Sequence, residues 1–121
     1  MYKNHEIGKF GEDIATKFLL KKGYYIYDKN FRCKLGEIDI IAIDNIDKNE
    51  LVFIEVKTRT QAAFDTPASS IDKNKIKHIR KTAEYFLTKN NLKDTFIRFD
   101  VIEIYKKFDK LHLNHIKNAI L

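Results

Sequence analysis

The sequence predicts an α/β protein in which a mixed β-sheet is flanked by helices. Two amphipathic helical patterns alternate with short runs rich in Ile, Val, Phe and Tyr. The chain has 121 residues, of which 44% are hydrophobic and 33% are charged. This length suits one domain with its own core, and this composition excludes a disordered chain. We therefore expect a single domain over residues 1–121, with the element order αβββαββ.

The first helix is predicted over residues 5–21, and Gly23 follows it as a stop signal. Hydrophobic residues recur at spacings of three and four positions, which is the period of one helix face. They are Ile7, Phe10, Ile14 and Phe18. Glycine inside a helix costs about 1 kcal/mol relative to alanine. We therefore expect Gly8 and Gly11 to allow this helix to approach the sheet closely.

A short strand over residues 24–28 and a basic connection over residues 29–36 are expected next. Residues 37–43 and 50–58 are rich in Ile and Val, and the segment between them is rich in Asp and Asn, which is typical of a β-hairpin. If the hairpin is symmetric about Asp47, Ile43 lies opposite Leu51 and Asp39 lies opposite Glu55.

The second half of the chain is expected to contain a loop, a helix and two strands. Residues 60–70 form the loop, and the helix begins near residues 69–72 and ends near Asn90. Its apolar face comprises Ile76, Ile79, Ala83, Phe86 and Leu87. A strand is predicted over residues 96–105, and residues 111–115 are expected to pair back on it.

The net charge of +6 is concentrated in this second helix. Between residues 71 and 92, six Lys or Arg side chains stand against two acids, which gives +4. They are Lys73, Lys75, Lys77, Arg80, Lys81 and Lys89. Such a basic element is typical of a nucleic-acid-binding protein, although a solvated lysine-rich helix face would give the same pattern.

Several classes of protein and site are excluded by the sequence. No apolar run approaches the roughly 20 residues that cross a bilayer, and the first residues lack the apolar core of a secretory signal. Cys33 is the only cysteine, which agrees with a reducing compartment, so we expect a cytoplasmic protein without a membrane partner. The four histidines, including His115, show no zinc-site spacing and are interpreted as surface or edge residues.

Charged residues interrupt the two hydrophobic strands of the predicted hairpin. The inferred register places Asp39 and Glu55 about 5 Å apart between Cβ atoms, where two carboxylates repel each other unless a cation lies between them. Mg²⁺ or Mn²⁺ is the expected cation, because hard cations bind carboxylate oxygens. Lys57 shares a strand face with Glu55 and could stabilise charge on a phosphate. The alternative is that these side chains simply face solvent.

A third acid, Glu12, lies beside Gly11 on the first predicted helix. If the helix approaches the sheet there, the Glu12 carboxylate could reach the metal or a water molecule on it. An exposed glutamate on a helix interrupted by Gly11 is the alternative interpretation.

The order of Asp39, Glu55 and Lys57 resembles the active-site pattern of restriction-endonuclease-like nucleases, in which an acid precedes a D/E-x-K motif. Further segments are GKFGEDIATKFLLKKGY (8–24), GEIDIIA (36–42), FIEVKTR (53–59), RFDVI (98–102) and HIKNAI (115–120). Together they resemble the bacterial YraN family over nearly the whole chain. That family is uncharacterised and endonuclease-like.

This resemblance implies a restriction-endonuclease-like αβββαβ core, similar to that of archaeal Holliday junction resolvases. It implies that Glu12, Asp39, Glu55 and Lys57 are catalytic, and that Asp39, Glu55 and the carbonyl of Val56 bind the metal. Lys75 and Arg98 match motif positions that contact phosphate or support the site. The residues predicted to bind nucleic acid are Arg59, Lys73, Lys75, Lys77, Arg80 and Arg98.

The predicted function is that of a divalent-metal-dependent endonuclease acting on DNA. No base-reading element is evident, so we expect recognition of branched or single-stranded DNA in recombination or repair, with RNA as an alternative substrate. Symmetric cutting of two strands would require a homodimer. The alternative function is a nucleic-acid-binding module with weak or no catalysis that assists a partner enzyme in recombination or repair.

Overall fold

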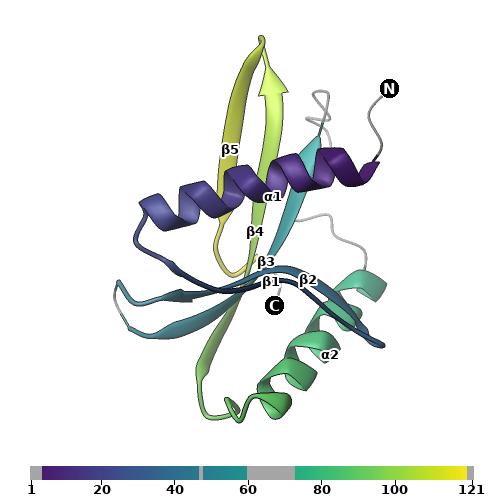
Figure 1. Cartoon of the computed structure of the whole chain (residues 1–121), viewed down its shortest axis with the longest axis vertical. Helices are drawn as coiled ribbons and strands as arrows, with labels where there is room; N and C mark the ends of the chain where they lie inside the picture. Colours follow the sequence, from purple (N-terminus) through teal and green to yellow (C-terminus); the bar gives the residue numbers. More distant parts are fainter. Residues whose placement is uncertain (1–3, 47, 60–72, 120–121) are drawn as a thin grey trace.

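The computed structural model describes residues 4–46, 48–59 and 73–119. Its elements are α1 (Asn4–Lys21), β1 (Tyr25–Cys33), β2 (Gly36–Asp44), β3 (Glu50–Arg59), α2 (Lys73–Lys89), β4 (Phe96–Lys107) and β5 (Lys110–Ile116). The predicted α/β class and the mixed sheet flanked by helices are confirmed (Figure 1). The predicted loop over residues 60–70, the helix start at residues 69–72 and Asp47 lie outside the described residues.

The strands of the described sheet lie side by side in chain order, from β1 to β5. β3 and β4 are parallel, whereas the other neighbouring strands are antiparallel. Parallel neighbours need a long crossover connection, and α2 lies in that connection. Within the described residues, neither helix is long and apolar enough to cross a membrane.

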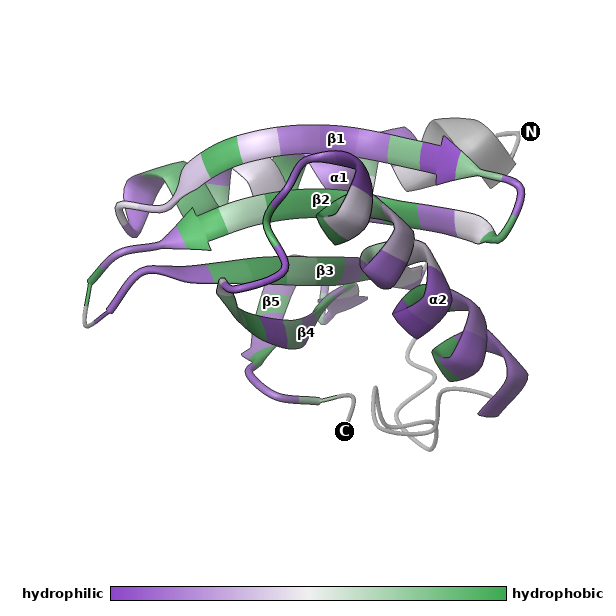
Figure 2. Ribbon diagram, turned by 90° about the horizontal axis from the view of Figure 1, so that it is seen from below, coloured by the Kyte–Doolittle hydropathy of each residue, from purple (hydrophilic) through white to green (hydrophobic). Residues whose placement is uncertain are grey.

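The two helices pack on opposite faces of the sheet. Leu19 of α1 packs in one hydrophobic cluster with Val52 of β3, whereas Phe86 of α2 packs in another with Phe53. Neighbouring residues of a strand point to opposite faces, so the two clusters are separated by the sheet. Figure 2 shows the result: β2 and β3 are mostly hydrophobic, and the outer surface of α2 is largely hydrophilic.

The predicted register of the β2–β3 hairpin is confirmed over its paired part. Ile43 lies opposite Leu51, and Ile40 lies opposite Ile54. Because both strands are buried, a slip of one residue would expose a whole hydrophobic face to solvent. This register brings the acids of the two strands to the same end of the hairpin.

The predicted connection over residues 29–36 was wrong, because β1 continues to Cys33. Lys29 pairs with Ile40 and Phe31 pairs with Ile38, so this stretch forms an edge strand on β2. The register shifts between Ile26 and Asp28, and Asn30 has a positive φ of 54°. These irregularities break the alternation by which a strand is recognised in a sequence.

Candidate active site

β2 and β3 separate at the point where their acidic residues lie. Their paired residues end at Ile40 and Ile54, and Figure 1 shows the two strands diverging beyond that point, β2 beside β1 and β3 beside β4. The Asp39 Oδ2 atom accepts a hydrogen bond of 2.8 Å from the N–H of Val56. The carboxylate of Asp39 thus bridges the two strands where the backbone no longer does so.

Asp39 and Glu55 lie close together, as the sequence predicted. Burial and the charge of Glu55 raise the pKa of Asp39 to about 8, even though the hydrogen bond from Val56 opposes this shift. Glu55 itself is only 7% exposed. Two carboxylates in such a position share a proton near neutral pH or require a cation between them.

Lys75 of α2 forms an ion pair with Glu55. Burial alone would lower the pKa of Lys75, but the hydrogen bond and the charge of Glu55 outweigh it and raise this pKa. Lys75 precedes the buried Ile79 by four positions, so it extends the face of α2 that packs on the sheet. Its place in the site, not on the outer surface, was visible in that spacing.

Lys57 lies two residues beyond Glu55 on β3 and is half-buried. Burial lowers its pKa, and the nearby charge of Lys75 lowers it further. The sequence placed Lys57 in the same site as Glu55, and the electrostatic interaction between the two residues agrees with that placement.

Glu12 of α1, the third predicted acid, interacts electrostatically with Asp39. Its charge acts on Asp39, and its own pKa is raised mainly by burial, although a hydrogen bond from Asn30 opposes the shift. Asn30 was missed in the sequence analysis because it lies in the stretch predicted as a connection. The backbone of Asn30 has a positive φ, which asparagine tolerates better than most residues.

Gly11 allows α1 to contact β3 directly. A Cβ atom at Gly11 would lie 1.8 Å from the Oγ1 of Thr58, so any other residue would force the Thr58 side chain or the helix to move. This confirms the expected close approach at Gly11. At Gly8 a Cβ atom would meet nothing within 4 Å, so close packing does not explain that glycine.

We expect Gly11→Ala to destabilise the protein by about 1–3 kcal/mol, because overpacking outweighs the gain in helix propensity. The matched control is Gly8→Ala, which adds the same methyl group where space is open and should be neutral or stabilising by up to about 1 kcal/mol. Urea denaturation of the two variants measures the difference. Equal stabilities would contradict the close contact between Gly11 and Thr58.

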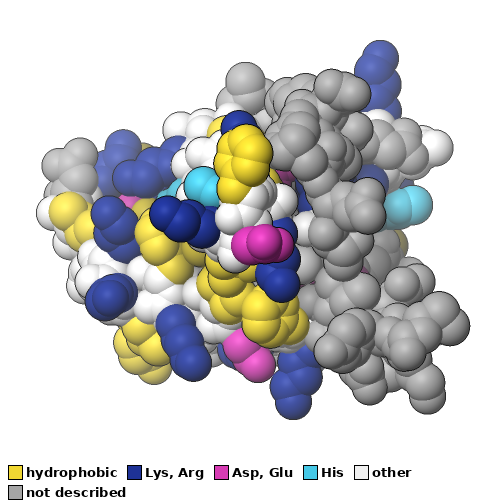
Figure 3. Space-filling view, turned by 90° about the horizontal axis from the view of Figure 1, so that it is seen from above, with side chains coloured by type: hydrophobic (Ala, Val, Ile, Leu, Met, Phe, Trp, Pro, Cys, Tyr) yellow, Lys and Arg dark blue, Asp and Glu magenta, His cyan; other side chains and the backbone are white. Residues whose placement is uncertain are grey.

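Three residues predicted to bind nucleic acid, Lys73, Lys77 and Arg80, lie exposed on α2. Arg59 instead pairs with Glu103 at 2.9 Å between Nε and Oε2, with both side chains largely buried. Figure 3 views the molecule from the end opposite α2, and there too Lys and Arg side chains outnumber Asp and Glu on the described surface. The positive charge therefore extends beyond α2.

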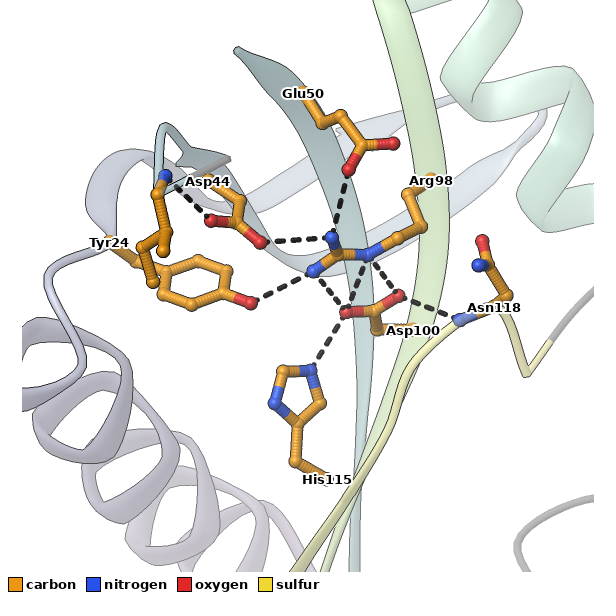
Figure 4. A network of polar contacts seen from close by, with 8 residues as sticks. Tyr24, Asp44, Glu50, Arg98, Asp100, His115 and Asn118 are labelled. Atoms are coloured by element: carbon orange, nitrogen blue, oxygen red, sulfur yellow. Dashed lines mark hydrogen bonds and ion pairs between the residues drawn. The ribbon is translucent and has the colours of Figure 1, made fainter. Parts of the chain in front are cut away.

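Arg98 is not available for the predicted contact with nucleic acid. It is only 6% exposed, and its guanidinium nitrogens donate to four side chains (Figure 4). These are Asp100, Asp44, Glu50 and Tyr24, at distances of 2.8 to 3.2 Å. The sequence could not show this burial, because most of these partners are distant along the chain. Arg98 joins β2, β3 and β4.

His115 belongs to the same network. It lies on the edge strand β5, in agreement with the predicted surface or edge position, but its side chain does not face solvent. Its side chain is 10% exposed, and its Nε2 lies 2.8 Å from Oδ2 of Asp100. The N–H of Asn118 donates to the other oxygen of Asp100 at 3.0 Å. Asp100 thereby attaches β5 and the residues after it to the centre of the sheet.

The acids, the lysines and the close contact of α1 all lie within one segment of the chain. The model of the family described as "Uncharacterised protein family UPF0102" matches residues 11–104, which include that segment. The chain belongs to this family. Its resemblance to an uncharacterised family is confirmed to that extent, and the family description assigns no activity.

Curated UPF0102 relatives cover nearly the whole chain. A UPF0102 protein of Caldanaerobacter subterraneus is 47% identical over 116 residues, covering 93% of each chain. A UPF0102 protein of Caldicellulosiruptor saccharolyticus is also 47% identical and covers 94% of this chain and 96% of its own. A UPF0102 protein of Clostridioides difficile is 47% identical and covers 96% and 97%, respectively.

Proposed function

We propose that this protein is a divalent-metal-dependent endonuclease of the restriction-endonuclease-like type that acts on DNA. The observation that carries the proposal is the pair of carboxylates, Asp39 and Glu55, held together where β2 and β3 diverge. Lys57 and Lys75 lie beside this pair. An acid pair with an adjacent lysine is suited to the chemistry of phosphodiester hydrolysis.

The donor set fits a hard cation such as Mg²⁺ or Mn²⁺. Asp39 and Glu55 offer carboxylate oxygens, and the carbonyl of Val56, the residue after Glu55, offers a third oxygen. Within residues 4–46, 48–59 and 73–119, no group of three or more His, Cys, Asp or Glu side chains is arranged around a common metal position. Mg²⁺ is commonly held by one or two carboxylates, with water and substrate phosphate completing its coordination.

When bound, such a cation polarises a phosphate group and lowers the pKa of a nearby water molecule. The protein's own residues have separate tasks. The ammonium group of Lys57 stabilises negative charge that develops on the phosphate. Glu12, whose pKa is raised, orients a water molecule by hydrogen bonding and can hold a proton from it. Lys75 neutralises Glu55 in the free protein and is near enough to contact a phosphate.

The exposed lysines and arginine of α2 would hold the DNA backbone. Lys73, Lys77 and Arg80 are free to neutralise phosphates at the side of the helix that does not pack on the sheet. Backbone contacts carry no base sequence, which favours recognition of branched or single-stranded DNA in recombination or repair. A homodimer would supply the two sites needed to cut two strands symmetrically.

One observation favours the second candidate, a nucleic-acid-binding module with little catalysis that assists a partner enzyme. Lys75 already neutralises Glu55, so the carboxylate pair is partly compensated without a metal. Such a module would bind DNA with a strong dependence on salt, and its binding would survive the loss of Asp39.

Cleavage of a panel of labelled DNA molecules separates these candidates. Linear duplex, single-stranded, flap and four-way DNA are incubated with the protein in Mg²⁺, Mn²⁺ or EDTA. If the protein is a nuclease, we expect cutting only in the buffers that contain Mg²⁺ or Mn²⁺, with branched DNA preferred. Retarded bands without cutting in any buffer would instead indicate a nucleic-acid-binding module. The same panel made of RNA tests the alternative substrate.

Metal binding should be visible in the melting temperature. We expect millimolar Mn²⁺ to raise the Tm by several degrees, because a ligand at about 100 times its Kd stabilises by about 2.7 kcal/mol. Binding requires ionised carboxylates, and the pKa of Asp39 is about 8, so the shift should grow as pH rises from 6 to 8. Differential scanning fluorimetry measures this. A Tm unaffected by Mn²⁺ at pH 8 would contradict the proposed coordination.

A further inference from the structure

The hairpin between β4 and β5 carries the most exposed large hydrophobic side chain among the described residues. Phe108 is 87% exposed at its tip. Within the described residues, the pairing of β4 with β3 ends at Tyr105, which lies opposite Arg59, and the β4–β5 hairpin continues beyond that point. In Figure 1 its tip projects from the rest of the molecule, so the ring of Phe108 is presented to whatever binds at this end.

The backbone at the tip is unusual for an aromatic residue. Phe108 and Asp109 have positive φ values of 53° and 59°, as in a two-residue type I′ turn. Such turns favour Asn and Gly, and a bulky residue at positive φ is uncommon. The conformation of the turn therefore does not explain why a phenylalanine occupies position 108. Residues kept in costly conformations concentrate at functional sites.

The charges around Phe108 indicate what kind of molecule the tip binds. Lys106, Lys107 and Lys110 are exposed beside it, and Asp109 is the one acid between them, which gives a net charge of +2 over these residues. The Nζ of Lys107 lies 5.8 Å from the centre of the Phe108 ring. An exposed aromatic ring among lysines is the combination by which proteins bind unpaired nucleotides. Figure 3, seen from this end, shows Lys and Arg side chains around hydrophobic ones.

We propose that the β4–β5 tip is a second DNA contact, in which Phe108 stacks on an unpaired base and the neighbouring lysines contact phosphates. The proposal rests on the proposed function, that the chain acts on DNA, and it adds the feature of the substrate that is recognised. That feature is the unpaired or unstacked base at a branch point. A continuous linear duplex, in which every base is paired and stacked, offers no such base away from its ends.

The register of the sheet gives the distance between this contact and the site. Lys57 lies opposite Glu103 on β4, and Phe108 lies five residues further along the chain, in the turn directly after this strand. At about 3.3 Å per residue this separation is about 16 Å. It corresponds to about five base steps of 3.4 Å. The tip would therefore hold the branch point about five nucleotides from the phosphate that Lys57 contacts.

The test measures binding by the full-length chain in EDTA, so that cleavage plays no part. Fluorescence anisotropy gives the Kd for a four-way DNA junction and for a linear duplex of the same sequence, and 2-aminopurine at the branch reports stacking. The variant is Phe108→Asn, because asparagine suits the positive φ and keeps the turn folded. The matched control is Phe96→Asn. Phe96 begins the same strand, is 66% exposed and has the Nζ of Lys48 5.1 Å from its ring.

We expect Phe108→Asn to raise the Kd for the junction by about 5- to 150-fold, the range that corresponds to loss of one base–aromatic stack. Binding to the linear duplex should change by less than about twofold, and the 2-aminopurine response should disappear. Phe96→Asn should leave both affinities unchanged, and Phe108→Trp should retain the response of the wild type. Replacing Lys106 and Lys110 by alanine should lower the slope of log Kd against log salt by about 0.7–0.9 for each lysine.

Three results would overturn the proposal: a junction affinity of Phe108→Asn equal to that of the wild type, an equal loss on junction and duplex, or a loss confined to binding of phosphatidylserine vesicles. The last would assign the tip to a membrane surface. Binding that depends on Phe108 but is not followed by metal-dependent cutting would support this contact and contradict the nuclease. The two proposals can therefore fail separately.

Discussion

Asp39→Asn is expected to abolish metal-dependent cleavage while making the metal-free protein more stable. The amide oxygen can still accept the hydrogen bond from the N–H of Val56, and the amide nitrogen can donate to Glu55. The variant thus keeps the geometry and removes the repulsion between two carboxylates. It also removes an oxygen ligand that carries charge, which a hard cation requires.

The sign of the stability effect follows from the raised pKa of Asp39. Folding raises this pKa from its ordinary value of about 4 to about 8, so the folded state binds the proton more tightly. The free energy of unfolding of the wild type therefore falls as pH rises from 4 to 8. We expect Asp39→Asn to melt about 3–6 °C above the wild type at pH 8 in EDTA, which corresponds to about 1 kcal/mol.

Scanning fluorimetry at pH 5 and pH 8, with EDTA or Mn²⁺, measures this effect. The advantage of the variant should be small at pH 5, where Asp39 is protonated in the wild type, and should be lost in Mn²⁺, which stabilises only the wild type. A variant that melts below the wild type at pH 8 in EDTA would contradict the repulsion between Asp39 and Glu55.

Arg98→Met is expected to destabilise the fold by about 3–5 kcal/mol, the cost of leaving a buried charge without its partner. Asp100 is completely buried and Asp44 nearly so, and both carboxylates accept hydrogen bonds from the Arg98 guanidinium. Methionine is unbranched and apolar, so it fills much of the same volume without satisfying either carboxylate. The Tm should fall by more than about 10 °C.

The matched control is Arg32→Met, which breaks an ion pair with Glu37 of 3.0 Å whose side chains are 74% and 57% exposed. An exposed pair of this kind contributes about 1 kcal/mol or less. Urea denaturation of both variants gives the comparison. Equal losses of stability for Arg98→Met and Arg32→Met would contradict the central role of the buried network.

The pH dependence gives a second check on this network. Burial alone would raise the pKa of Asp100, but the hydrogen bonds from His115 and Arg98 outweigh burial and lower it. A carboxyl with a lowered pKa stabilises the fold above its ordinary pKa of about 4, and this stabilisation is lost as pH falls below that value. The deficit of Arg98→Met should therefore shrink in acid, where Asp100 without its arginine becomes protonated.

Local patterns were sufficient to predict the α/β fold class and the proximity of Asp39 and Glu55. Hydrophobic periodicity predicted both helices, and the symmetry of a short loop predicted the register of Ile43 with Leu51, which places Asp39 beside Glu55. These features depend on residues near one another in the chain. The close contact of Gly11 with β3 was predicted because glycine inside a helix needs a reason.

Features that depend on distant residues or irregular backbone were not predicted. Arg98 was interpreted, from its match to a motif position, as a contact to nucleic acid or a support of the site, whereas here it is buried and donates to three acids and a tyrosine. The second half of β1 was missed because Asn30 and the irregularity near Asp28 interrupt the strand pattern. Lys75 was expected to contact phosphate or support the site, but its ion pair with Glu55 depends on how α2 packs against β3 and was not predicted.

The central claim is that Asp39 and Glu55 bind a divalent cation on which DNA cleavage depends. The most direct measurement is the single-turnover rate of cleavage of a labelled four-way junction as a function of Mn²⁺ concentration, for the wild type, Asp39→Asn and Glu55→Gln. The account predicts a saturable rate for the wild type, with the same Mn²⁺ midpoint as the rise in Tm, and a loss of at least about a thousandfold in both folded variants. Cleavage by either variant at the rate of the wild type, or cleavage that persists in EDTA, would contradict it.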